Sequence, residues 1–137
     1  MHMAEDRLGK TRLTGAYAWQ TFLKQGSRVA AGSDFPVELA NAFHGLYAAV
    51  SRQDKDGAPK GGWLAEEKLT REQALRAFTL DAAYAAHQEF KIGSLEKGKW
   101  ADFIIVDTNY FKAPLSDIYH TQVEQTWLAG ELKYQQK

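Results

Sequence analysis

One short stretch of the sequence places a carboxylate where a catalytic group is expected. A short run at 28–32, apolar from Val29 onward, is followed directly by Ser33 and Asp34. The run is apolar without alternation, which is typical of a buried parallel strand. Ligands of α/β proteins bind just beyond the carboxyl ends of such strands. Asp34 is therefore a candidate metal ligand or proton acceptor. The local alternative is that Ser33 or Asp34 caps a helix beginning near Pro36.

The histidines form no metal-binding pattern. They are His2, His44, His87 and His120. Neither the H-x-H nor the H-x-x-x-H spacing of zinc sites occurs among them. His44, in the middle of a predicted helix, is either a site residue or a packed histidine. Weak zinc binding by Asp34 and one histidine stays an alternative, although two ligands rarely hold zinc.

Apolar periodicity predicts three helices, one early strand and three late strands. The helices are expected over 13–25, 38–51 and 70–86, and the early strand over 28–32. Thr70 and Gln73 match a capping box at the start of the third helix. A glycine-rich loop is expected over 52–68, and loops of that length are usually functional or disordered. Trp63 in this loop either lines a pocket or anchors the loop.

The chain is expected to end in a small sheet. The late strands are predicted over 103–106, 123–128 and 131–134. Ala129-Gly130 is a two-residue hairpin signal between the last two strands. The predicted order is therefore helical with one early strand, and then β-rich.

Composition excludes several classes of function. The 137 residues are 45% hydrophobic and 25% charged, with 17 basic and 17 acidic side chains, so nucleic-acid binding has no electrostatic support. There are no cysteines, which excludes thiolate chemistry and disulfides. No apolar run is long enough to cross a membrane and no signal peptide is visible, so a cytoplasmic protein is expected.

Several motifs together resemble the amidohydrolase superfamily. The segment Gly-Ser-Asp-Phe-Pro-Val-Glu at 32–38 resembles the turn after strand 8 in those enzymes. Further stretches agree in the same order, at 7–9, 45–50, 52–53, 61–63, 69–76, 79–84 and 93–103. The branch that the chain is most similar to is amidohydrolase family 3, whose members are similar to N-substituted formamide deformylase.

The resemblance implies a fold and a domain division. It implies a (β/α)₈ barrel with a small β-sandwich, of which residues 1–90 would be the last barrel part and 91–137 the sandwich strands. A barrel needs about 250 residues, so this chain would supply only its last βα unit. The main partner would then be the missing N-terminal portion of a longer parent protein.

The resemblance also implies a chemistry. A divalent metal, usually zinc, would activate water to attack a non-peptide C–N bond of the amide or formamide type. Asp34 would be the metal-site carboxylate after strand 8, and Arg52, Gln53 and Trp63 would border the substrate cleft. The family's other ligands have no counterpart in this sequence, so the chain alone is expected to bind no metal and to be inactive.

Two further expectations concern association. An exposed barrel edge around 28–32 would pair with other chains, which predicts a homo-oligomer. The alternative to an enzyme part is a non-catalytic interaction module whose binding surface is formed by the strands and the 52–68 loop. No nucleic-acid or membrane partner is expected.

Overall fold

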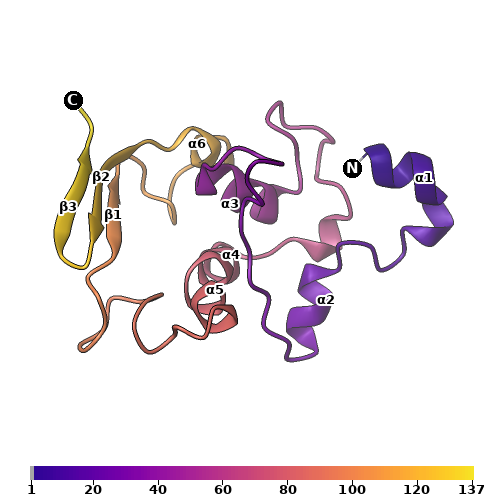
Figure 1. Cartoon of the computed structure of the whole chain (residues 1–137). Helices are drawn as coiled ribbons and strands as arrows, with labels where there is room; N and C mark the ends of the chain where they lie inside the picture. Colours follow the sequence, from indigo (N-terminus) through magenta and orange to yellow (C-terminus); the bar gives the residue numbers. More distant parts are fainter. Residues whose placement is uncertain (1) are drawn as a thin grey trace.

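A computed structural model of the chain describes residues 2–137, and it divides into a helical part and a small sheet (Figure 1). The helices are α1 (His2–Arg12), α2 (Trp19–Lys24), α3 (Ala42–Ser51), α4 (Arg71–Phe78), α5 (Leu80–Ala85) and α6 (Leu115–His120), with a 3₁₀ turn at Ala65–Glu67. The strands are β1 (Phe103–Val106), β2 (Val123–Leu128) and β3 (Glu131–Gln135). The predicted order of a helical segment followed by a small antiparallel sheet is therefore confirmed.

Helix α3 is the centre of the hydrophobic core, and it packs against α4 and α6. Phe43, Leu46, Tyr47 and Val50 of α3 are all buried, as helical periodicity predicts for one face. Ile118 of α6 is fully buried against them. Burying a side chain of that size contributes roughly 1.5–3 kcal/mol. The core thus fixes the carboxyl end of α3, where the candidate site residues begin.

The predicted strand over 28–32 is wrong for this chain. The segment has no strand conformation and forms no ladder with any part of residues 2–137. Its one backbone bond to a distant element runs from Ala31 N–H to the Ala77 carbonyl, at 3.0 Å. A parallel strand exists only when neighbouring strands supply its hydrogen bonds. The described sheet consists of β1–β3 and supplies none to this segment.

Three predicted helix boundaries are also corrected. The helix predicted from residue 13 starts at Trp19, because Gly15 and Tyr17 have positive φ angles of 83° and 50°. The helix predicted from 38 starts at Ala42, and Asn41 caps it by accepting a hydrogen bond from Phe43 N–H. The helix predicted over 70–86 is divided into α4 and α5, since Thr79 has non-helical angles. Helices α1 and α6 were not predicted, because neither has a clear apolar stripe.

The local signals for the third helix and for the hairpin are confirmed. Thr70 accepts a hydrogen bond from Gln73 N–H, and the Gln73 side chain accepts one from Thr70 N–H, which completes the capping box. Ala129 and Gly130 both have positive φ, as a two-residue turn of type I′ requires. The sheet has the order β1-β2-β3 and is antiparallel throughout.

No helix within residues 2–137 is long and apolar enough to cross a membrane.

Candidate functional site

Asp34 lies at the surface on a tight turn. Its φ angle is +56°, and its carbonyl accepts a hydrogen bond from Val37 N–H at 2.9 Å. The side chain is exposed. The interpretation of Ser33 or Asp34 as a helix cap is wrong, because no helix begins near Pro36 and Asn41 caps α3 instead.

The residues before Asp34 border a cavity of about 410 Å³, which we call the His44 pocket. It is lined by Gly32, Ser33, Glu38, Leu39, Asn41, His44, Gly45, Tyr47, Ala48, Gln53, Asp54, Lys55 and Tyr119. The His44 ring stacks on Tyr119, with the ring centroids 4.1 Å apart and the planes 8° from parallel. His44 is therefore both packed and at a pocket wall, so the two sequence alternatives for it are not exclusive.

The helix cap also orients His44. Asn41 Oδ1 accepts from Phe43 N–H, so the amide atom that faces His44 Nε2, at 3.4 Å, is Nδ2. The Asn41 amide therefore contacts one ring nitrogen of His44, and which atom donates depends on the tautomer of the ring.

A second cavity, of about 430 Å³, adjoins the first, and we call it the Arg52 pocket. It is lined by Tyr17, Trp19, Glu38, Ala48, Arg52, Gln53 and Trp63. The three residues predicted to border a substrate cleft thus lie together in one cavity. Glu38, Ala48 and Gln53 line both pockets, so the two cavities share a wall. Asp34 lines neither of them.

Arg52 is buried at the carboxyl end of α3, with 5% of its surface exposed. Its backbone is left-handed, with φ 58°, and its carbonyl accepts a hydrogen bond from Trp63 N–H at 2.8 Å. The Arg52 side chain makes a second bond to Trp63, in which Nε donates to the Trp63 carbonyl at 2.9 Å. Nη1 donates to the Tyr17 carbonyl at 3.3 Å. Arg52 therefore joins α3, the 52–68 loop and the segment before α2.

Aromatic rings surround the guanidinium group. Its carbon lies 4.5 Å from the Trp19 ring centroid and 5.2 Å from that of Trp63. Burial lowers the pKa of Arg52, while Glu67 and Glu66 act in the opposite direction. The contact of Tyr17 and Trp19 with Arg52 was not predicted, because nothing in a local pattern pairs residues so far apart in the sequence.

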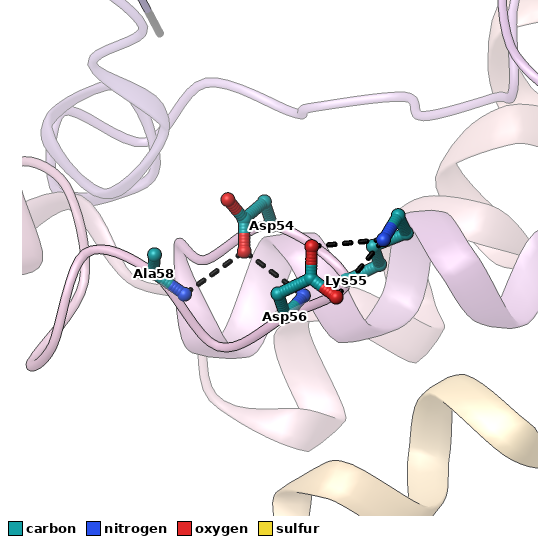
Figure 2. A network of polar contacts seen from close by, with 4 residues as sticks. All are labelled: Asp54, Lys55, Asp56 and Ala58. Atoms are coloured by element: carbon teal, nitrogen blue, oxygen red, sulfur yellow. Dashed lines mark hydrogen bonds and ion pairs between the residues drawn. The ribbon is translucent and has the colours of Figure 1, made fainter.

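The 52–68 loop has a defined structure. Gln53 Nε2 donates to the carbonyls of Gly57 at 2.6 Å and Pro59 at 3.1 Å. Figure 2 shows Asp54 Oδ1 accepting hydrogen bonds from the backbone N–H groups of Asp56 and Ala58, and Lys55 paired with Asp56. Trp63 Nε1 donates to Glu5 Oε1 at 2.9 Å. Trp63 accordingly anchors the loop and also lines a pocket. The two alternatives that the sequence left open for this residue are therefore compatible.

The residues present do not form a complete metal site. Within residues 2–137 no group of three or more histidine, aspartate or glutamate side chains lies close enough to hold an ion. Asp34 can offer one carboxylate, and a zinc site needs at least three protein ligands.

Comparison with known proteins identifies the family. The profile of the amidohydrolase family matches residues 1–134. The chain is 34% identical to the protein LONG AFTER FAR-RED 3 of Arabidopsis thaliana, over 97% of this chain and 24% of that protein. It is 29% identical to N-substituted formamide deformylase of Arthrobacter pascens, over 85% of this chain and 21% of that protein.

A solved structure shares the fold. An amidohydrolase from Thermotoga maritima MSB8 superposes with a TM-score of 0.65 over 88% of this chain and 26% of that chain, at 21% identity. The chain spans about a quarter of the length of the curated relatives that it matches. Since the family profile covers nearly all 137 residues, the chain belongs to the amidohydrolase family.

Proposed function

We propose that this chain is the C-terminal part of a longer amidohydrolase that hydrolyses a non-peptide C–N bond of the amide or formamide type. The observation that carries the proposal is the family match over residues 1–134 in a chain that spans about a quarter of its relatives. The name of one relative, N-substituted formamide deformylase, supports the bond type.

A place for the chain within the parent is part of the proposal. Residues 1–90 would belong to the end of a (β/α)₈ barrel, and residues 91–137 would add strands to a small β-sandwich. The unpaired segment 28–32 supports this placement. Its apolar residues would become the eighth barrel strand once neighbouring strands supplied hydrogen bonds. The same segment leads directly to Asp34, so the carboxylate would lie at the catalytic end of the barrel.

Asp34 is proposed as the chain's contribution to the metal site and to proton transfer. The metal would be a divalent ion, zinc by analogy with the family, and it would supply activation of the attacking water. Most of its ligands would come from the rest of the parent. What this chain's own carboxylate would do is accept and return a proton at its exposed oxygens.

Arg52, Gln53 and Trp63 are proposed to border the substrate. Their support is that they line one cavity, which shares a wall with the cavity bordered by Gly32 and Ser33. Substrate identity depends on residues of the parent outside this chain.

The isolated chain is predicted to be catalytically inactive. One carboxylate without the other ligands cannot hold a zinc ion, so added metal should not produce turnover. The test is hydrolysis of an N-substituted formamide by the purified chain, with and without zinc, beside the full-length parent as positive control. Zinc-dependent turnover by the chain alone would contradict the prediction.

A second candidate is a non-catalytic interaction module. The observation in its favour is the exposed apolar segment after Asp34, in which Phe35, Val37 and Leu39 are all more than half exposed. Exposed apolar groups of this kind mark interfaces. In the parent enzyme the same side chains would be covered by the barrel. The hydrolase proposal and the interaction-module proposal therefore both predict an interface here, and they differ in what covers it.

A further inference from the structure

The Arg52 pocket contains a buried cation with an unused donor. Nε and Nη1 of Arg52 are satisfied by the carbonyls of Trp63 and Tyr17. Nη2 has no hydrogen-bond acceptor anywhere in the described chain, although the residue is 95% buried. Leaving a buried N–H group without a partner is unfavourable, and more so when the group is charged.

Neighbouring side chains do not fill this role. Trp19 and Trp63 lie against the guanidinium group and compensate part of its lost hydration, but ring faces accept no conventional hydrogen bond. The carboxylate of Glu67 is engaged with the backbone N–H and the hydroxyl of Thr21, at 2.9 Å and 2.5 Å. Within residues 2–137 no side chain, the Glu38 and Glu66 carboxylates included, accepts a hydrogen bond from Nη2, so this donor is available to an acceptor that a ligand supplies.

We propose that the Arg52 pocket binds a carboxylate attached to a flat apolar group, with the carboxylate on Arg52 Nη2 and the flat group against Trp19 and Trp63. Arginine N–H groups form short, charge-assisted hydrogen bonds to carboxylates. A cavity of about 430 Å³ has room for one ring and its acid group. Tyr17 is 55% exposed and is the least buried of the three rings, so its side chain is the one that moves to admit the ligand.

Charge in the pocket favours a monoanion over a dianion. Glu38 lines the same cavity and is exposed, so its carboxylate repels a second negative charge. A doubly charged phosphate would be repelled by Glu38 about twice as strongly as a carboxylate. The expected ligand is thus a carboxylic acid, and in the parent it would be an acid group on the substrate that lies away from the bond being cleaved. This last step alone rests on the proposed function.

The experiment is a titration of the purified chain with benzoate, followed through the indole N–H signals of its four tryptophans by NMR. Benzamide has the same shape without the charge and is the matched probe. Benzoate is expected to shift the signals of Trp19 and Trp63 and to leave those of Trp100 and Trp127 in place. It should bind at least about tenfold more tightly than benzamide, as a charge-assisted hydrogen bond allows. Equal affinity for the two probes, or equal shifts at all four tryptophans, would overturn the proposal.

Two variants test the assignment of the charges. Arg52→Met is expected to abolish the preference for benzoate over benzamide. Since Arg52 also holds the loop, Glu38→Gln provides a second test, because the Glu38 side chain makes no hydrogen bond or ion pair within residues 2–137. It should strengthen benzoate binding by roughly twofold at low ionic strength, because a repelling charge is lost. Weaker benzoate binding by Glu38→Gln, or an unchanged preference in Arg52→Met, would refute the carboxylate site.

Failure of this inference is distinguishable from failure of the proposed function. The titration measures binding by the chain and involves no turnover. If benzoate does not bind while the full-length parent hydrolyses a formamide, the carboxylate site is wrong and the hydrolase proposal stands. If benzoate binds and the parent has no hydrolase activity, the hydrolase proposal is wrong and the carboxylate site stands.

Discussion

Asp34 has a left-handed backbone conformation and an exposed side chain. A positive φ is uncommon for residues other than glycine, although aspartate is among those that tolerate it. At +56° and exposed, the Asp34 side chain is available to groups that this chain does not provide. Backbone outliers of this kind cluster at functional sites. The geometry thus supports a role in a site that is completed by other residues.

Tyr110 provides a pH-dependent test of the fold. Burial raises its pKa to about 12, and its hydroxyl donates to the Arg71 carbonyl at 3.0 Å. In the unfolded chain the tyrosine pKa is about 10, so the unfolded state loses its proton first as pH rises. The stability that the neutral phenol contributes is complete below pH 10 and is lost between about pH 10 and 12.

The expected loss is about 2–3 kcal/mol over that range, since one pKa unit corresponds to about 1.4 kcal/mol. Urea unfolding at a series of pH values measures it. Tyr110→Phe is the control: it should be less stable at neutral pH and should show a smaller decline above pH 10. Identical declines in the two proteins would contradict the assignment.

The loop between α3 and α4 depends on a close approach at Gly62. A Cβ atom at Gly62 would lie 2.4 Å from the Ser51 carbonyl oxygen, whereas one at Gly61 would meet no atom of the described residues within 4 Å. Both glycines have positive φ, at 91° and 87°. The pair therefore separates backbone strain from steric overlap.

Gly61→Ala is expected to cost about 1 kcal/mol of unfolding free energy from backbone strain. Gly62→Ala should cost roughly 3 kcal/mol, because the added methyl also pushes the loop away from α3. Gly62→Ala should in addition weaken the reciprocal contacts of Arg52 and Trp63. Chemical denaturation of the two variants checks the order, and equal losses would show that the close approach is unimportant.

The elements that could be predicted from the sequence are those with local causes. The capping box at Thr70 and the turn at Ala129-Gly130 depend on neighbouring residues alone, and both formed as predicted. The start of α2 and the break at Thr79 depend on left-handed or non-helical angles that apolar periodicity does not reveal. The strand over 28–32 failed because a strand depends on partners, and the described chain has none for it.

The candidate site was predictable to the same limited degree. The resemblance singled out Arg52, Gln53 and Trp63, and the fold places them in one cavity. It did not indicate Tyr17 or Trp19, whose contacts with Arg52 span more than thirty residues and arise only from the tertiary fold. The stack of His44 on Tyr119 has the same origin. Whether any of these residues touches a substrate stays a prediction.

At the scale of the molecule, the chain exposes apolar side chains next to a segment that has no strand partner within residues 2–137. Segment 28–32 forms no ladder with any part of residues 2–137, and the exposed Phe35, Val37 and Leu39 follow it. Such edges associate with other chains. We therefore expect the purified chain to self-associate at micromolar concentration.

Light scattering measures this association. Replacing Phe35 and Val37 together by serine should shift the chain toward monomer, since the apolar contact is removed while the rest of the surface is kept. The matched control replaces Phe90 by serine, since this side chain is also exposed and lies outside residues 28–39 of the sequence. A wild-type chain that is monomeric over the same concentrations would count against the predicted interface.

We infer that this chain supplies the Asp34 carboxylate to an amidohydrolase site. The test is the kcat of the full-length parent with Asp34→Asn on an N-substituted formamide. We expect kcat to fall roughly 10²–10⁴-fold, as for loss of a catalytic proton acceptor. Asp117→Asn, which changes an exposed carboxylate in α6, should keep parental turnover. A kcat of Asp34→Asn equal to that of the unmodified parent would show that this carboxylate takes no part in catalysis.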